Sequence, residues 1–453
     1  ELVPTHRASQ SLQMAQLYAY TDYALQSLAS DLWSGYYETI KDANAVLVRL
    51  PDLRSRLSSA EQLQLDYLAG EAKTLKALSY LQLLQLFATP YDDAEHTAGI
   101  ILKDRVEREE LPRSTKAETV QAIERLLKEA LTAFDTTTRP PYGSAPGFVN
   151  AATARALLAR LYLYAGDWAK AEEVTRTLVP AMLSASMVPT TPLAWSQGAS
   201  TIALFASSVP VTYYNSIYAQ AKSATNATYQ LPQRSYLAST DLRHRSYALD
   251  STLQVDATTT RSLQIIGKYA AFLFAGVLPS YNCVVRTTEP IFLRAEALAR
   301  SGDETAACDL LNSYLRLVGA DEVASTVTGS ALIEAIIAEK AREFAGEGLR
   351  FFDLKRLGLP IEHYTPMRSV SPSHYQQGAT SAPCHFPPPS AQIRTSGHRT
   401  LGGQSLPIDL ILLLSYLHYE DFPLSSLTEH RDHRALLPAP PFAPPLVCEG
   451  YPR

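Results

Sequence analysis

Apolar residues recur at helical spacing near the start of the chain. Spaced three or four positions apart, five of them are Leu25, Leu28, Leu32, Tyr36 and Ile40. This spacing indicates an amphipathic helix, which Pro51 is expected to end. Beyond it, Ser58 or Ser59 stands three residues before an acidic or amide residue, a capping-box pattern typical of a helix start. The pattern therefore predicts a pair of helices over about residues 31–88.

Two further stretches repeat this layout. The pattern predicts helix pairs at about 115–183 and 289–318, with Gly-Asp turns at 166–167 and 302–303 inside them. Glycine favours a helix end and aspartate the next helix start. Small alanines where two helices would touch, with Leu and Tyr between, are typical of tetratricopeptide units. Such pairs stack side by side, because each alone leaves an apolar face exposed.

The segment from about residue 180 to 285 has a different pattern. It is rich in Ser, Thr, Tyr and Pro and lacks long helical periodicity, which predicts loops with short strands and helices, such as one at Thr201–Ala206. The expected fold class is all-α, with tetratricopeptide-like helix pairs packed against an irregular, loop-rich segment. The helical domain should span residues 1–364.

Residues 365–453 form a tail rich in proline and histidine. The short run Leu406–Tyr419 is its only stretch with a regular hydrophobic pattern, so we expect this tail to be poorly ordered. A reading-frame shift near Pro366 is our hypothesis for the abrupt change. Resequencing the gene, and finding the same frame with this tail in related chains, would refute it.

Composition and charge narrow the range of functions. The chain has 453 residues, of which 46% are hydrophobic and 19% charged, enough for a substantial core. A formal net charge of −5 gives no general attraction for phosphate backbones or anionic lipid, which argues against nucleic-acid binding. The longest apolar run, Ile408–Leu417, is too short to cross a bilayer.

Sequence motifs give no support for a cofactor, a metal or a catalytic nucleophile. We find no phosphate-binding glycine loop, dinucleotide-binding pattern, nucleophile elbow or zinc-binding His-Glu-x-x-His helix. Four cysteines lie far apart without zinc-site spacing, and we interpret them as unpaired: Cys283, Cys308, Cys384 and Cys448. No cofactor or metal ion is expected, and catalytic residues are predicted to be absent.

The richest charged cluster lies near the end of the predicted helical domain. Its members are Glu339, Arg342, Glu343, Glu347, Arg350, Asp353 and Arg356. Spaced three and four apart, they predict alternating ion pairs along a helix end and its following turn. A glycosidase would use two such carboxylates as acid and base, but each carboxylate here has an arginine within a turn. We therefore interpret the cluster as a structural ion network.

Aromatic and polar residues in predicted loops are the candidates for ligand binding. Sugar rings and peptide side chains both stack on aromatic faces, while Asn and Asp give directional hydrogen bonds. The candidates are Tyr91, Asp92, Trp195, Tyr213, Tyr214, Asn215 and Tyr218. The alternative for the residues from Tyr213 to Tyr218 is a strand or short helix that buries alternate rings.

Five stretches in order along the chain resemble the SusD/RagB family. They are residues 33–47, 70–91, 152–171, 239–249 with the pair Lys268-Tyr269, and 284–303 followed by 338–358. The last contains AEKAREFAGEGLRFFDLKRLG, similar to the family's Glu-Arg-Arg-x-Glu-Phe-x-x-Glu-Gly-x-Arg-x-x-Asp-Leu-x-Arg signature. The resemblance covers about Trp33 to Ile361, and the tail from about residue 366 departs from it.

The resemblance implies a non-enzymatic, nutrient-binding lipoprotein on the outer face of the outer membrane. Such a protein would hold an oligosaccharide or a peptide for a SusC/RagA-like TonB-dependent transporter. We expect any lipid anchor to lie on residues upstream of Glu1. Two alternatives stay open: a tetratricopeptide scaffold for a protein partner, which predicts regular repeats without a long insertion, and a glycan-processing enzyme, which predicts turnover of oligosaccharides.

Overall fold

A computed structural model describes most of the predicted helical region. The described residues are 3–4, 22–136, 148–191, 194–195, 201–206, 229–230, 236–254, 258, 260–268 and 281–359. The chain divides into two compact units, Glu1–Leu410 and Ile411–Arg453, and every described residue belongs to the first. The predictions for the tail 365–453 therefore lie outside the described residues.

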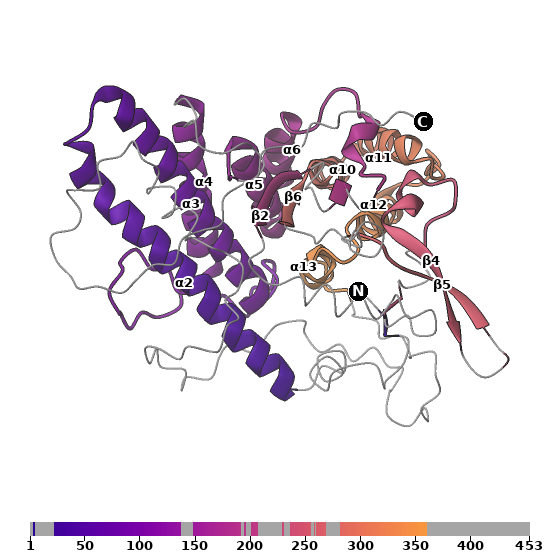
Figure 1. Cartoon of the computed structure of the whole chain (residues 1–453), viewed down its shortest axis with the longest axis horizontal. Helices are drawn as coiled ribbons and strands as arrows, with labels where there is room; N and C mark the ends of the chain where they lie inside the picture. The colour runs from indigo at the N-terminus through magenta and orange to yellow at the C-terminus, as the bar shows by residue number, and fades with distance from the viewer. Residues whose placement is uncertain are drawn as a thin grey trace, which may run out of the picture. The chain divides into compact units, whose positions relative to one another are not determined.

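The first helix pair consists of α2 (Asp22–Arg54) and α3 (Ser59–Phe87), which pack side by side (Figure 1). The predicted capping box is present, because the Ser58 side chain accepts from the Glu61 amide and the Glu61 carboxylate accepts from the Ser58 amide at 2.8 Å. Contrary to the prediction, α2 continues through Pro51 to Arg54. A proline so close to a helix end removes one backbone hydrogen bond and leaves only a short stretch beyond it.

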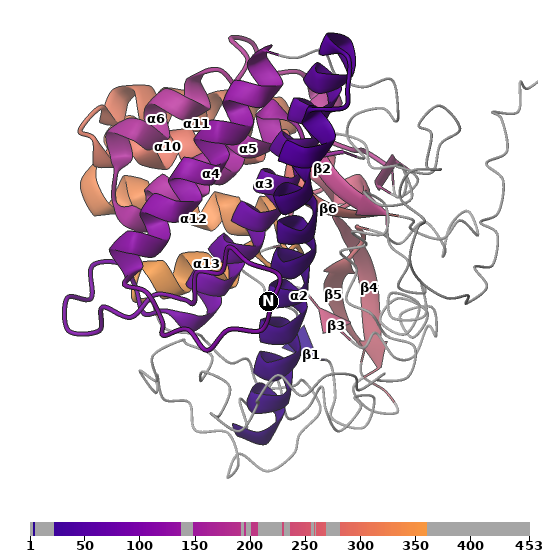
Figure 2. The same cartoon turned by 90° about the vertical axis from the view of Figure 1, so that its left-hand side faces the viewer.

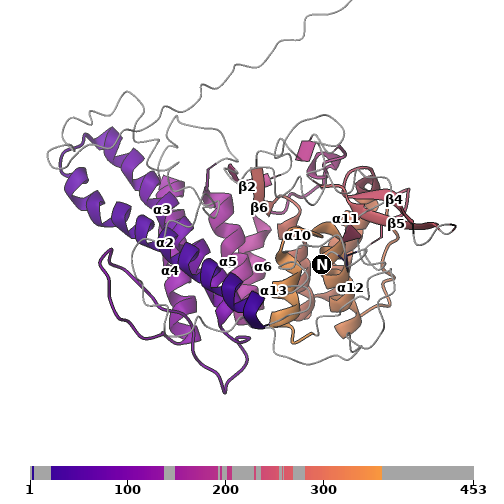
Figure 3. The same cartoon turned by 60° about the horizontal axis from the view of Figure 1, so that its bottom comes forward.

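The remaining helices continue a series in which each packs on its neighbour (Figures 2 and 3). Their bounds are α4 (Lys116–Thr136), α5 (Ala151–Ala165), α6 (Trp168–Arg176), α10 (Glu289–Arg300), α11 (Glu304–Val318), α12 (Gly329–Glu343) and α13 (Leu349–Arg356). Gly166 ends α5 at a φ of 73°, a left-handed conformation that glycine adopts without strain. Asp167 and Asp303 cap the helices that follow the two Gly-Asp turns.

The loop-rich segment contributes short paired strands. Strand β2 (Thr201–Ala206) pairs antiparallel with β6 (Tyr281–Arg286), and β4 (Ala248–Gln254) pairs with β5 (Thr260–Ile266). A third pair joins β1 (Val3–Pro4) to β3 (Tyr229–Gln230). The 3-10 helices η2 (Ala185–Met187) and η5 (Leu242–Arg245) lie in the same segment. Helices dominate the described residues, which confirms the all-α fold class.

Two buried clusters form the core of this unit. The first core joins α2 to α5 and is mostly aliphatic, with Leu81, Leu84, Leu127, Leu157 and Leu161 fully or almost fully buried. The second core joins α10, α11 and α12 to the loop-rich segment and holds buried rings: Trp195, Tyr247, Phe292, Tyr314 and Phe344. Within the described residues, no helix has both the length and the apolar character that crossing a membrane would require.

Helix α13 closes the series by reaching back to the first helix pair. The ammonium of Lys355 donates to the carbonyls of Gln85 at 2.7 Å and Leu86 at 2.8 Å. These carbonyls belong to the last turn of α3, where they lack intrahelical partners and where a positive charge is favourable. Residues 270 positions apart are thereby in direct contact.

Candidate ligand-binding site

Tyr91 and Asp92 lie on the loop that follows α3, as predicted. Tyr91 is half-buried and Asp92 is exposed. The Tyr91 ring meets the ring of Tyr164 on α5 edge-on, with the centroids 5.9 Å apart. The Tyr164 hydroxyl also donates to the carbonyl of Thr89 at 3.0 Å, so α5 holds the start of this loop. An aromatic ring and a carboxylate are thereby presented next to each other at the surface.

A buried lysine holds the same loop from the inside. The Lys116 ammonium, at the start of α4, donates to the Pro90 carbonyl at 2.6 Å, the Asp93 carbonyl at 2.7 Å and the Thr89 hydroxyl at 3.2 Å. Burial lowers the pKa of Lys116, and the negative charges of Asp93 and Asp92 act against this shift. All three donor positions of the ammonium are used, so the loop is fixed at both sides of Tyr91.

Lys116 was missed by sequence reasoning, although a signal was present. It is the first residue of α4, where the helix dipole disfavours a positive charge. A lysine in that position indicates a compensating partner, which here is the loop from Thr89 to Asp93. The local pattern gave the helix start, with Glu118 accepting from the Thr115 amide at 2.8 Å, but not the contact with the loop.

Of the other residues predicted to bind ligand, one is buried and the rest lie outside the described residues. Trp195 is fully buried in the second core, with its ring 4.9 Å from that of Tyr247 and the guanidinium of Arg286 4.7 Å above it. Its ring therefore has no exposed face that could support the predicted ligand contact. Tyr213, Tyr214, Asn215 and Tyr218 lie outside the described residues, and their role stays a prediction.

The charged cluster forms a buried ion network around Glu343, at the end of α12. Glu343 is fully buried and accepts hydrogen bonds from Arg286, from the Tyr314 hydroxyl, and from Thr288 at 2.9 Å. Burial opposes its ionisation, but the charges of Arg286, Arg243 and Lys268 overcome this and lower its pKa to about 2. We call these side chains and their ionic partners the Glu343 network: Asp241, Arg243, Tyr247, Lys268, Arg286, Thr288, Tyr314, Glu339, Glu343 and Glu347.

The partners in this network differ from the predicted ones. We expected ion pairs along a helix end and its following turn, but Glu347 pairs with Lys268 at 2.6 Å and with Arg286 at 2.9 Å. Both cations come from the loop-rich segment. Local pairs do exist, such as Arg356 with Asp353 at 2.7 Å. The predicted structural ion network is therefore present, but it joins segments far apart in the sequence.

Two alternative roles for the side chains of this network are metal binding and general acid catalysis. Among them, no group of three or more His, Cys, Asp or Glu side chains is arranged to hold a metal ion. Cys308 is buried in the second core. A carboxylate with a pKa near 2 is ionised at neutral pH, so Glu343 is unsuited to act as a general acid there.

Comparison with known families matches most of the chain. Residues 3–163 match a family described as "Starch-binding associating with outer membrane", of the SusD-like type, and residues 213–383 match the SusD family, named SusD_RagB. The motifs had indicated a resemblance from about Trp33 to Ile361. The two matched ranges start before the first of these residues and end beyond the second. A search of curated proteins gives no match.

Solved structures share the fold. A SusD-like carbohydrate binding protein from Bacteroides vulgatus superposes with a TM-score of 0.64 at 18% identity, covering 80% of this chain and 76% of that one. A SusD superfamily protein from the same species gives 0.64 at 24% identity, covering 80% and 82%. One from Bacteroides thetaiotaomicron gives 0.64 at 18% identity, covering 80% and 83%. At these identities the likeness shows the fold.

Proposed function

The chain belongs to the SusD/RagB family, and from this premise we propose that it binds oligosaccharide or peptide nutrients at the cell surface without transforming them. It then delivers them to a TonB-dependent outer-membrane transporter. Family membership supports carbohydrate or nutrient binding. The outer face of the outer membrane as its location, and a SusC/RagA-like transporter as its partner, are parts of this proposal.

The observation that carries the proposal is the fixed loop with Tyr91 and Asp92. Stacking on a sugar ring or a peptide side chain needs an aromatic face that is ordered before the ligand arrives, because ordering it later costs free energy. The Lys116 contacts and the Tyr164 hydroxyl supply this order. The exposed Asp92 carboxylate can accept hydrogen bonds from sugar hydroxyls or peptide amides.

A binding role also agrees with how the buried carboxylates are used. Glu289 pairs with Arg160 at 2.6 Å, and Glu296 pairs with Arg356 at 2.6 Å. Like Glu343, these groups serve the interior packing of the protein. Incubation with a labelled oligosaccharide library tests the enzymatic alternative, and steady release of shortened products would overturn the non-enzymatic part of the proposal.

Calorimetric titration tests the proposed binding. The probes are maltoheptaose, a panel of other neutral and acidic oligosaccharides, and a mixture of hexapeptides. We expect at least one class to bind, and Tyr91→Ala to weaken that binding by about tenfold, since a ring contact contributes on the order of 1 kcal/mol. Tyr91→Phe keeps the ring and serves as the matched control, with affinity near that of the wild type.

Two results of this experiment would contradict the proposal. Absence of binding to every probe at about 1 mM, a concentration that detects contacts worth only about 4 kcal/mol, would remove the nutrient-binding role. Binding that Tyr91→Ala leaves unchanged would move the site away from this loop. Binding of peptides alone, or of glycans alone, would settle the ligand class.

A further inference from the structure

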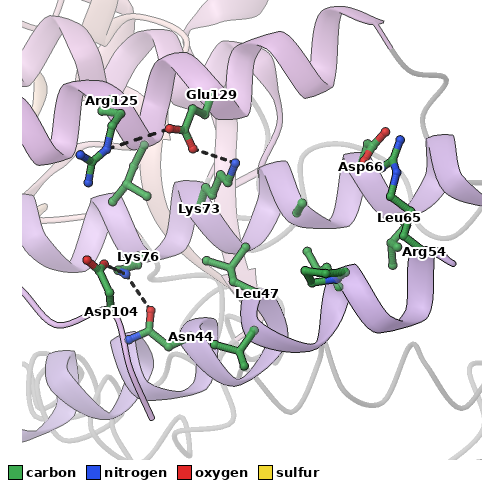
Figure 4. Close-up of a pocket in the computed structure, with 15 residues that line it drawn as sticks. Asn44, Leu47, Arg54, Leu65, Asp66, Lys73, Lys76, Asp104, Arg125 and Glu129 are labelled. Carbon is green, nitrogen blue, oxygen red and sulfur yellow. Dashed lines mark hydrogen bonds and ion pairs between the residues drawn. The ribbon is translucent and has the colours of Figure 1, made fainter.

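A groove runs between α2, α3 and α4, away from the Tyr91 loop. This open groove has a volume of about 560 Å³ (Figure 4). Aliphatic side chains from all three helices line it, including Leu47, Leu65, Ala69 and Leu126. At its edge, Val48 is 59% exposed, unusually open for a valine inside a helix pair. We call this the α2–α4 groove.

Residues 101–104 of the same chain form an extended segment that lies beside α2 and α3. The Tyr37 hydroxyl contacts both the carbonyl and the amide of Ile101, at 2.8 and 2.9 Å. The Tyr80 hydroxyl does the same at Lys103, at 2.8 and 2.7 Å. Alternate residues of the segment thus turn their backbone groups to the same side, as in a β-strand. Hydroxyl groups on α2 and α3 take the place of a neighbouring strand.

The groove begins beside Lys103 and Asp104 of this segment. Asn44 donates to the Lys103 carbonyl at 2.9 Å, and the Lys76 ammonium donates to Asn44 at 2.7 Å and to Asp104 at 2.8 Å. Asn44, Lys76 and Asp104 also line the cavity. The cavity is therefore continuous with a surface that holds strand-like backbone, and Figure 4 shows Arg54 and Asp66 at its opposite end.

Charged side chains at the edge of the groove suit a peptide. Lys73 pairs with Glu129 at 2.8 Å, and Arg54 pairs with Asp66. Such groups supply donors and acceptors for backbone amides and carbonyls, and an arginine has five N–H donors. Cations outnumber carboxylates among the lining residues, with Arg54, Lys73, Lys76 and Arg125 against Asp66, Asp104 and Glu129. This balance favours an acidic side chain on the partner.

We propose that the α2–α4 groove binds an extended peptide segment of a partner protein, with alternate aliphatic side chains on the apolar floor and acidic ones at the edge. Continuity of the groove with the strand-like backbone at Lys103 and Asp104 is the principal argument. The peptide would continue along the helices where this segment leaves them. Tyr91 and Asp92 do not line the groove, so this binding is independent of the proposed nutrient site.

The probe that tests this proposal is an N-acetylated, fluorescein-labelled octapeptide of alternating Leu and Glu. Anisotropy should show saturable binding, and an octapeptide with Ser in place of Leu should bind about tenfold more weakly or not at all. Ala69→Trp fills the floor and should weaken binding by about tenfold or more. Leu63→Trp is the matched control, because Leu63 is 45% exposed on the same helix and does not line the groove.

A second variant keeps the test valid if Ala69→Trp fails to fold. Val48→Glu adds like charge at the exposed edge, and it should weaken binding of the acidic peptide while the melting temperature stays near that of the wild type. Methyl NMR on leucine-labelled protein should show shifts at Leu47, Leu65 and Leu126. No binding at about 1 mM peptide would overturn the proposal. So would unchanged affinity in both variants, or a self-associated dimer that Ala69→Trp dissociates.

Discussion

The first and second cores are stabilised by different kinds of contact. In the first core, leucines and alanines from α2 to α5 interlock, and most polar contacts lie at its edges. In the second, aromatic rings enclose the Glu343 network, where cations and carboxylates are buried together. Burying an ion costs several kcal/mol, which only good geometry and complete pairing offset. The stability of an aliphatic core depends on the volume of its side chains, whereas the stability of a buried ion network depends on which residues pair with each charge.

This difference determines how each core should respond to substitution. An aliphatic core tolerates changes that conserve volume, because neighbouring side chains can repack. A buried ion network does not, because removing one charge leaves its partners in a low-dielectric interior without compensation. Glu343 has three cations and several hydroxyl groups around it, so it is the position where the contrast should be largest.

The largest predicted effect is therefore that of Glu343→Ala. We expect it to lower the free energy of unfolding by about 3–5 kcal/mol, because Arg286 and Arg243 lose their buried partner. Urea denaturation followed by circular dichroism measures this. Glu322→Ala is the control, since Glu322 pairs with Arg316 at the surface and should contribute about 1 kcal/mol or less. Equal losses in both variants would contradict the special role of buried charge.

A substitution in the first core should be costly only when it removes volume. Leu81→Ala should cost about 2–5 kcal/mol through the cavity that it leaves. Leu81→Met conserves volume and should cost less than about 1.5 kcal/mol. In the second core, Glu343→Gln also conserves volume but should still be strongly destabilising. If Glu343→Gln proved as mild as Leu81→Met in thermal melts, the distinction between the two cores would be lost.

Acidic pH should weaken the second core through Glu343. Its pKa falls from 4.5 to about 2 on folding, so its stabilising contribution is present above pH 4.5 and is lost as the pH falls toward 2. The shift corresponds to about 3 kcal/mol. The stability difference between wild type and Glu343→Gln should stay constant from pH 7 to about 5.5, because Glu343 stays ionised there, and shrink below pH 4.5. A difference that stayed constant to pH 3 would refute this assignment.

The smallest predicted effect is at the edge of the first core. Tyr80→Phe removes a hydroxyl that serves both backbone groups of Lys103, and it should cost about 1–2 kcal/mol. Hydrogen exchange should also speed up at the Lys103 amide. Tyr36→Phe is the control, because the Tyr36 hydroxyl makes no hydrogen bond to any residue that the structure describes, and little change is expected there. Faster exchange in both variants would argue against a specific role for Tyr80.

Helices and their caps could be predicted because their causes are local. The capping boxes at Ser58 and Thr115 and the glycine at 166 each act within one helical turn. The pairing of β2 with β6 could not be predicted, because their sequences are separated by a long irregular stretch and neither carries a turn signal for the other. Local pattern identifies elements but not their distant neighbours.

The same limit applies to the candidate site. Tyr91 and Asp92 follow a helix in a stretch with loop composition, so their loop position could be predicted. The burial of Trp195 depends on Tyr247 and Arg286, which reach it only in the folded chain. The carboxylates of the Glu343 network were recognised by their spacing, but their cations come from other segments. Periodicity carries no information about such contacts.

The contact made by Lys355 affects the order in which parts of the chain can complete their folding during translation. Its ammonium serves the carbonyls of Gln85 and Leu86, at the end of a helix that leaves the ribosome long before it. Translation proceeds from the amino terminus, and early segments begin to fold during synthesis. Until residue 355 has emerged, the carbonyls at the end of α3 lack this partner. A nascent chain arrested before residue 355 would lack these two hydrogen bonds.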